Sequence, residues 1–399
     1  MADTLGRTRS TFRFPRVEVD LAGIIVGGAG WLAYTAAWPL LASVLGITEK
    51  AGLIAVAKGQ PSFVEVPQGA VLHWALLRPV FKYVTFPGAA SIKSLLGYPG
   101  DLVAPTEDFT HAPLPAQSPD LWKLVVAGLV LLLLALVIAG AIARVYALRK
   151  ARDESIGFDD AAAFSLKNLS QLAAGPFFMV AAVALFAFGG LACGALAGAP
   201  YAGPVLQVVA QPLAILAALV TTILVVGLVL GFPLYVCAVA VERNGSLDAV
   251  SRTYSYVFGR PVMYGVTALL LLAVAGLIEG FGGWFAGLAR MLMERGANWS
   301  GGADLAPSLK AAFDAAPALA TPVLPEGAGG GASASMWIAW IFAALTMLLL
   351  RGFIVSYVVG GFTDLYFMLR EEVEGVPPTE VYVEGVTAEL TQGVPPISK

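Results

Sequence analysis

Long apolar stretches without a charged side chain alternate along this chain with short charged segments. A helix needs roughly 20 apolar residues to cross the hydrocarbon core of a bilayer, which is about 30 Å thick. Six stretches are long enough, and they lie at 21–45, 121–147, 172–197, 212–241, 261–285 and 336–359. The pattern therefore predicts an all-α fold, a polytopic transmembrane helical bundle of about six spans.

The third and fourth spans form the clearest feature, because no Asp, Glu, Lys or Arg occurs from Asn168 to Val241. Gly198-Ala199-Pro200 and Gly203-Pro204 separate the two apolar runs and are typical of a turn. We expect a membrane hairpin over 172–241, with a kink at Pro233 in its second arm.

The segments outside the spans are predicted to be mostly irregular. Residues 1–20 carry four arginines and, with the first span, resemble a retained signal anchor. The outer loop 46–120 contains an apolar stretch, Ala70–Phe86, that favours an interfacial or re-entrant element. The outer segment 286–335 ends in a Gly-rich run, 327–333, which is typical of a flexible linker. Residues 360–399 are expected to form a solvated tail or a docking peptide.

Basic residues near the ends of the spans predict the orientation. With six spans, the side that holds both termini carries fourteen Lys or Arg, and the opposite side carries nine over a longer length. We therefore expect a multi-pass protein with both termini in the cytoplasm.

Composition narrows the classes of function. Hydrophobic residues make up 58% of the chain and charged residues 13%, about half the usual ~25%. This excludes a soluble enzyme, a disordered protein and a disulfide scaffold, and the net charge of −3 gives no reason to expect nucleic acid. The two cysteines lie in apolar runs, and two histidines cannot form a metal cluster. No catalytic motif occurs, so we expect no enzyme activity, cofactor or metal.

The fifth and sixth predicted spans each contain one charged residue. Arg351 is the one basic residue deep in an apolar span, and Glu279 in the fifth span is its candidate partner. A charge at membrane depth is a candidate functional site because it is costly unless paired. Glu279 is expected near the outer end of its span and Arg351 nearer the inner end, which argues against pairing. Snorkelling or structural pairing is favoured over a functional role.

Residues 246–260 predict an amphipathic helix at the cytoplasmic interface. Ser246 can cap the helix, and Asp248 suits its first turn. Asp248, Arg252 and Ser255 are expected on the polar face. The opposite, apolar face holds Leu247, Val250, Tyr254, Val257 and Phe258. An alternative is that this helix binds a protein partner.

Glycines recur at four-residue spacing inside the spans, for example at Gly23 and Gly27 or at Gly276 and Gly280. Such spacing lets two helix backbones approach closely. Packing within the bundle is favoured, and homo-oligomerisation through one of these faces is the alternative.

The segment Phe232–Leu272 carries Pro233 late in a span, Glu242 at its end, and then Ala249, Arg252 and Thr253 in a short helix. This arrangement resembles uncharacterised bacterial multi-pass proteins related to the membrane domain of glycerophosphodiester phosphodiesterases. The match covers about a tenth of the chain. The resemblance implies a helical integral membrane protein of the bacterial cytoplasmic (inner) membrane. It implies no assigned reaction, since the phosphodiesterase domain is absent.

Three classes of function remain. A non-enzymatic structural or accessory subunit of a membrane assembly is favoured, with membrane lipids around it and protein partners on 246–260 and the tail. A transporter or permease component for a lipid or other apolar substrate is the alternative, because the spans carry few ionisable groups. An intramembrane enzyme comes third.

Overall fold

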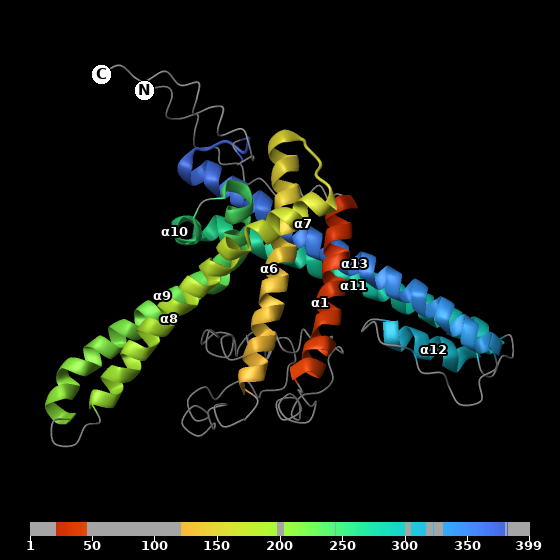
Figure 1. Cartoon of the computed structure of the whole chain (residues 1–399), viewed down its shortest axis with the longest axis horizontal. Coiled ribbons are helices and arrows are strands. Elements are labelled where there is room, and N and C mark those ends of the chain that lie inside the picture. The colour runs from red at the N-terminus through yellow and green to blue at the C-terminus, as the bar shows by residue number, and fades with distance from the viewer. Residues whose placement is uncertain are drawn as a thin grey trace, which may run out of the picture. The chain divides into compact units, whose positions relative to one another are not determined.

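The computed structural model describes residues 21–45, 121–197, 203–243, 245–299, 305–316, 322, 330–379 and 381 (Figure 1). Every regular element in this part of the chain is a helix. The elements are α1 Leu21–Leu45, α6 Leu121–Arg152, α7 Phe158–Lys167, α8 Leu169–Ala197, α9 Gly203–Glu242, α10 Ser246–Gly259, α11 Pro261–Trp299, α12 Leu305–Ala315 and α13 Gly330–Glu374. The all-α prediction is confirmed.

Five helices, α6, α8, α9, α11 and α13, are long and apolar enough to cross a membrane, and each contains one predicted span. Helix α1 has the predicted bounds. Its side chains are described without a gap from Leu21 to Ala37, and this apolar stretch is shorter than the five others. A chain with five such helices has more apolar surface than a soluble core can bury. The protein is a helical integral membrane protein.

The outer segment 286–335 differs from its prediction as an irregular loop. Helix α11 continues to Trp299, α12 follows, and α13 begins at Gly330, inside the expected linker. Residues 286–299 contain no proline and are rich in Ala, Leu, Met, Arg and Glu, which favour helix. Helix α13 also runs 15 residues beyond the predicted end of its span.

Some predictions lie outside the described residues. These are the N-terminal segment 1–20, the loop 46–120 with its interfacial element, residues 327–329 of the expected linker, and the tail after residue 381.

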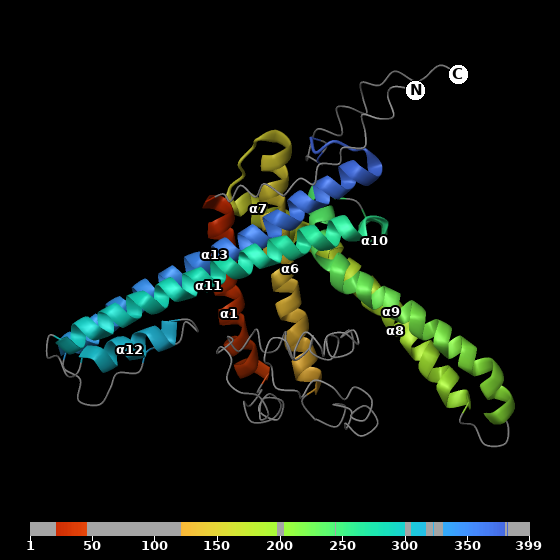
Figure 2. The same cartoon turned by 180° about the vertical axis from the view of Figure 1, so that it is seen from behind.

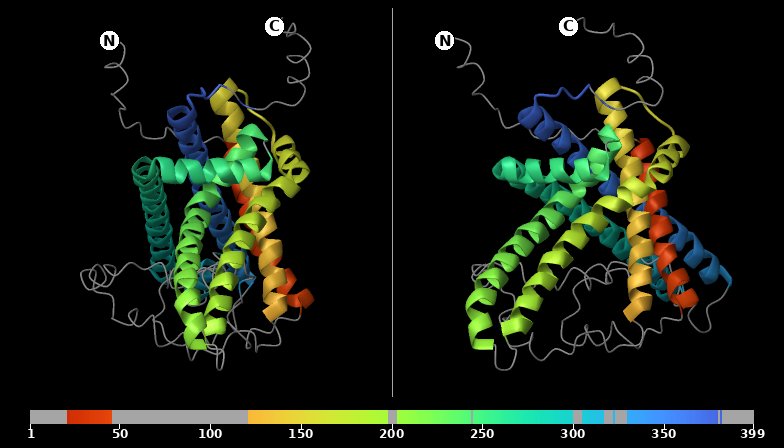
Figure 3. Two further views of the ribbon diagram at one scale, coloured as in Figure 1. Left: turned by 90° about the vertical axis from the view of Figure 1, so that its left-hand side faces the viewer. Right: turned by 60° about the vertical axis from the view of Figure 1, so that its left-hand side comes forward.

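The described residues form two compact units. The larger contains the described residues of 21–30, 136–292 and 346–381, and the smaller contains those of 31–45, 121–135 and 293–345. In the larger unit α8 and α9 run side by side as the predicted hairpin (Figures 1 and 3). The hydroxyl group of Tyr235 on α9 donates to the backbone of Gln171 on α8, and it accepts from the Gly175 N–H at 3.1 Å.

The parts of α11 and α13 in the larger unit also lie side by side and run antiparallel (Figure 2). Arg260, which precedes α11, pairs with Glu372 of α13 at 3.1 Å, and Leu271 packs on Gly361. These contacts fix the register of the two helices.

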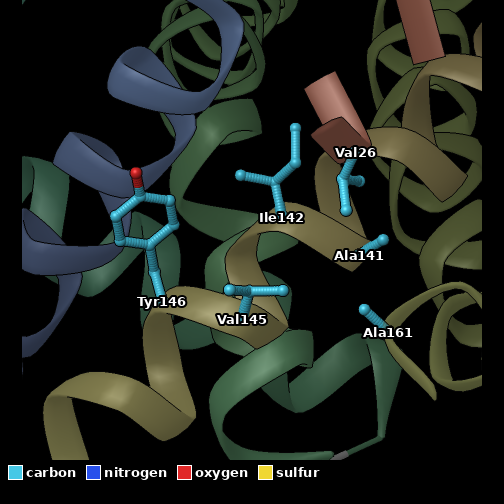
Figure 4. Packing of buried hydrophobic residues seen from close by; sticks show 6 residues of the cluster. All are labelled: Val26, Ala141, Ile142, Val145, Tyr146 and Ala161. Atoms are coloured by element: carbon cyan, nitrogen blue, oxygen red, sulfur yellow. The ribbon is translucent and has the colours of Figure 1, made fainter. Parts of the chain in front are cut away.

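A small apolar core joins α1, α6 and α7 in the larger unit, and Figure 4 shows six of its residues. Tyr146 on α6 points toward α13, where its hydroxyl lies 3.1 Å from Oγ of Ser356. Gly27 of α1 and Gly352 of α13 bring two backbones so close that a Cβ on either glycine would overlap the other helix. Gly23 faces Ser356 and Tyr146, so packing within the chain is confirmed for Gly23 and Gly27. A Cβ at Gly276 or Gly280 would meet nothing within 4 Å, so it is not confirmed for that pair.

The smaller unit contains two further clusters. Ala127 and Leu131 of α6 pack against the second half of α1. Leu309 and Ala312 of α12 pack against Ala297 of α11 and Met336 of α13.

Candidate functional site at the ends of α9, α10 and α13

Charged and phenolic side chains from three helix ends of the larger unit meet in one network. Helix α9 ends at Glu242, α10 begins four residues later, and α13 ends at Glu374. We call this network the Glu242 cluster, and it consists of Glu242, Arg252, Tyr256, Tyr366, Arg370 and Glu374.

Glu242 is the centre of the cluster. Its Oε2 lies 2.8 Å from Nη1 of Arg252, and its Oε1 lies 2.8 Å from Nε of Arg370. Tyr366 donates its hydroxyl proton to the same Oε1 at 2.8 Å. The side chain of Glu242 is only 7% exposed and that of Arg370 9%. A buried carboxylate at this position is tolerated because two guanidinium groups and a phenol replace the water it has lost.

Arg252 connects this centre to the surface. Its Nη1 lies 3.1 Å from Oε2 of Glu374, and its Nε donates to Asp248 one turn earlier at 3.0 Å. Tyr256, one turn later on α10, donates to Oε1 of Glu374 at 2.7 Å. Helix α10 is therefore attached to the last turn of α13 by two side chains that share one carboxylate.

The protonation equilibria of α10 reflect these contacts. Burial alone lowers the pKa of Arg252, but the carboxylates of Glu242, Glu374 and Asp248 together raise that pKa above its usual value. Burial raises the pKa of Tyr256, and the hydrogen bond and the negative charge of Glu374 raise it further. Both groups therefore keep their protons at neutral pH, as the hydrogen bonds require.

Two glycines on α9 form the surface on which α10 rests. The ring of Tyr254 occupies the space that a Cβ at Gly227 would fill, and the Tyr254 hydroxyl donates to the Leu224 carbonyl at 2.8 Å. The methyl group of Thr253 takes the corresponding place over Gly231. The spacing of Gly227 and Gly231 therefore serves packing within the chain, as predicted.

The predicted faces of α10 need correction. The buried residues are Ala249, Thr253, Tyr256 and Val257, so Val257 is the one predicted apolar residue that is fully buried. Leu247 and Phe258 stay exposed, at 63% and 45%, and Val250 and Tyr254 are half-buried. Arg252 is not on a solvated polar face, because the ends of α9 and α13 supply carboxylates that cover it.

The second site predicted from the sequence is Arg351 with Glu279, and the structure pairs them: Nη1 of Arg351 contacts Oε1 of Glu279. The prediction that their depths differ is wrong. Glu279 lies 19 residues after Arg260, and Arg351 lies 21 residues before Glu372, so both are about 30 Å from the same ion pair. The error came from ending the sixth span at residue 359, whereas α13 continues to Glu374.

Sequence reasoning missed Tyr256, Tyr366, Arg370 and Glu374 as site residues. A usable signal was present, because Glu242 directly follows the longest charge-free run and Arg370 lies just after another apolar run. Charges of opposite sign at the ends of two spans are candidates for pairing.

Comparisons with protein-family models, with curated proteins and with solved structures find no match to this chain. The resemblance of residues 232–272 to the phosphodiesterase membrane domain therefore stays a prediction. Glu242, Ala249, Arg252 and Thr253, which carry that resemblance, all lie at the junction of α9 and α10.

The chemistry available to the Glu242 cluster follows from its pairing. Each carboxylate of the cluster faces a guanidinium group or a phenol, and the guanidinium groups remain charged at all ordinary pH values. Among the described residues no group of three His, Cys, Asp or Glu side chains could hold a metal ion. What the arrangement does is hold α9, α10 and α13 together through these ion pairs and hydrogen bonds.

Proposed function

We propose that the protein is a non-enzymatic structural or accessory subunit of a membrane assembly, and that it presents α10 and the tail after α13 to protein partners. The proposal places it in the bacterial cytoplasmic membrane, following the resemblance of residues 232–272. Both termini are placed in the cytoplasm, following the distribution of Lys and Arg. The supporting observation is the Glu242 cluster. It fixes α10 to the residue at which α13 ends and the tail begins.

A binding surface benefits from such fixation, because a rigid element loses little conformational entropy when a partner docks. The outward side of α10 carries Leu247 and Phe258, which are exposed although they are large and apolar. Residues of this kind are typical anchors for a partner helix or for the membrane interface. The two alternatives differ in what should be found next to these side chains.

Site-specific photo-crosslinking in cells tests the proposal. A photoreactive residue replaces Leu247 or Phe258, and the matched control replaces Leu269, which is 69% exposed on α11. We expect a discrete protein adduct from α10 and none from position 269. The Arg252→Gln variant should reduce the adduct at position 258 at equal expression, because it releases α10 from α13.

Adducts only with lipid at both α10 positions would contradict the proposal. Purified protein without a partner that conducts a solute in liposomes would instead favour the transporter alternative.

A further inference from the structure

The hairpin of α8 and α9 changes its surroundings along its length. Near its base every residue from Leu234 to Val241 of α9 is buried. Farther from the base, none of the residues 180–195 and 211–226 is buried. The hairpin therefore consists of a packed base and an arm, and the large apolar side chains of the arm are exposed.

A proline interrupts each helix near the border between base and arm. These prolines are Pro176 in α8 and Pro233 in α9. Proline has no N–H, so in each helix the carbonyl four positions earlier has lost its usual donor. A helix bends most easily where such a bond is missing. Both helices therefore have a weak point between the base and the arm.

The hydroxyl group of Tyr235 bridges the weak point of α8. It accepts from the Gly175 N–H at 3.1 Å and donates to the Gln171 carbonyl. These two backbone groups lie four residues apart, so they would bond each other in an uninterrupted α-helix. A Cβ at Gly175 would overlap the Tyr235 ring, so only glycine fits there. The same contact shows that Pro176 and Pro233 lie at one level of the hairpin.

Helix α10 connects the arm to the rest of the larger unit. The ring of Tyr254 covers Gly227, which lies on the arm side of Pro233. On the other side of α10, Arg252 is bound to Glu374 at the end of α13 at 3.1 Å. The position of the arm is therefore determined by α10 as well as by Tyr235.

We propose that the hairpin is a hinged arm. The parts of α8 and α9 beyond Pro176 and Pro233 turn together about these prolines, Tyr235 latches the hinge, and α10 sets the angle of the arm in the bilayer. A hinge needs only a few residues that absorb the change in backbone angles. The hinge is a property of the chain alone, so it does not rest on the proposed partner of α10.

Helix α7 provides a fixed reference at the base of the hairpin. Asn168, which follows α7, accepts a hydrogen bond from Nε of Arg243 at 3.0 Å. The guanidinium group of Arg144 lies 4.5 Å from the ring centre of Phe164 on α7 and donates to the Ala240 carbonyl at 2.9 Å. A change in the distance between α7 and the arm therefore reports motion of the arm.

Distance measurements between two spin labels in the full-length protein, reconstituted in liposomes, test the hinge. One label is attached to Cys193 on the arm and the other to Leu166→Cys, a position that is 59% exposed on α7. Cys237 is buried and stays unlabelled. Cys193 lies 17 residues, or about 26 Å, beyond Pro176, so a turn of about 20° at the hinge moves this label by about 9 Å.

The labelled parent protein should give one narrow distance distribution. Tyr235→Phe keeps the ring but removes the hydroxyl group, and it should broaden the distribution by up to about 9 Å. Arg252→Gln should broaden it as well, because it releases α10 from α13. Adding Pro176→Ala and Pro233→Ala to Tyr235→Phe should narrow the distribution again, since both helices regain the missing hydrogen bond.

The matched control is Tyr146→Phe, which removes a hydroxyl group that lies 3.1 Å from Oγ of Ser356, outside the hairpin. It should give the distribution of the parent protein. A narrow distribution in Tyr235→Phe, or equal broadening in the control, would overturn the hinge. A triple variant that stays as broad as Tyr235→Phe would also overturn it, and a narrow distribution in Arg252→Gln would overturn the role of α10.

Discussion

Glu242 and Glu279 are both carboxylates that face arginine in an apolar protein, yet their surroundings differ. Glu242 has three partners from α10 and α13, and its side chain is 7% exposed. Glu279 pairs with Arg351 of α13, and its side chain is 48% exposed to the surroundings of the helix pair. The two carboxylates therefore differ in how many helices supply their partners: two helices for Glu242 and one for Glu279.

Geometry explains the difference. Side chains from several elements converge at Glu242, because the chain turns after it and α10 packs back against α9. In the middle of two antiparallel helices, a side chain reaches mainly the helix that faces it. We therefore expect the Glu242 cluster to contribute more to stability than the Arg351–Glu279 pair, and four experiments test this comparison.

The largest effect is expected from Glu242→Gln, which leaves the guanidinium groups of Arg252 and Arg370 without their shared carboxylate. Loss of one partner from a buried ion pair costs about 3–5 kcal/mol. Reversible unfolding in mixed micelles should show this loss, and Glu279→Gln, the same chemical change in the other region, should cost clearly less. Equal losses in the two variants would refute the comparison.

A smaller effect is expected from Gly227→Ala, which places a methyl group where the Tyr254 ring lies. Displacing a rigid ring from a packed site costs about 1–3 kcal/mol. The control is Gly276→Ala, where a Cβ meets nothing within 4 Å and the greater helix propensity of alanine should help. If both variants melt at the same temperature, the contact between α10 and α9 does not support the cluster.

The Arg351–Glu279 pair is suited to a double-mutant cycle with Arg351→Gln, Glu279→Gln and the combined variant. We expect a coupling of about 1 kcal/mol, since the pair is only partly buried. If the combined variant loses as much unfolding free energy as the two single variants together, the contact between the two side chains contributes nothing to stability. If Arg351→Gln leaves folding and cellular phenotype unchanged, a functional role for this charge is excluded.

The smallest effect is expected at alkaline pH through Tyr256. Its pKa is raised in the folded protein, so an unfolded chain loses this proton first as the pH increases. The stabilisation from this phenol is complete below pH 10, the ordinary value, and decreases as the pH approaches the folded pKa. The melting temperature of the wild type should therefore fall more steeply above pH 10 than that of Tyr256→Phe. Parallel curves would contradict the hydrogen bond to Glu374.

Much of the fold could be predicted from the sequence because one-dimensional hydropathy reports directly on membrane helices. The charge-free run 168–241 forms the predicted hairpin, and the predicted helix follows it. The predicted cap at Ser246 is wrong, because Ser246 is already the first helical residue and Gly245 is the N-cap, without a side-chain hydrogen bond. The helices within the outer segment 286–335 could not be predicted from hydropathy. Helices α11 and α13 extend past the C-terminal ends of their apolar runs because Leu, Met, Arg and Glu there have high helix propensity.

The candidate site shows the limit more clearly. Amphipathicity placed Arg252 on a polar face, because a helical wheel contains no information on neighbouring helices. In the structure Glu242 and Glu374, from the ends of α9 and α13, cover Arg252, whereas Asp248 and Ser255 of the same face stay exposed. The prediction that Arg351 and Glu279 lie at different depths was wrong for a related reason. The depth of a residue depends on where its helix ends and on which helix lies beside it.

By itself the sequence determined that this protein is helical and embedded in a membrane. A long uncharged apolar segment in lipid must satisfy its own backbone hydrogen bonds, and a helix does so. It also determined which few residues carry charge near the spans. Only the tertiary structure decided which of these charges meet: Glu242 with Arg252 and Arg370, and Arg351 with Glu279. The physical reason is that hydropathy is a local property of a chain, whereas an ion pair depends on the register between helices that are far apart in sequence.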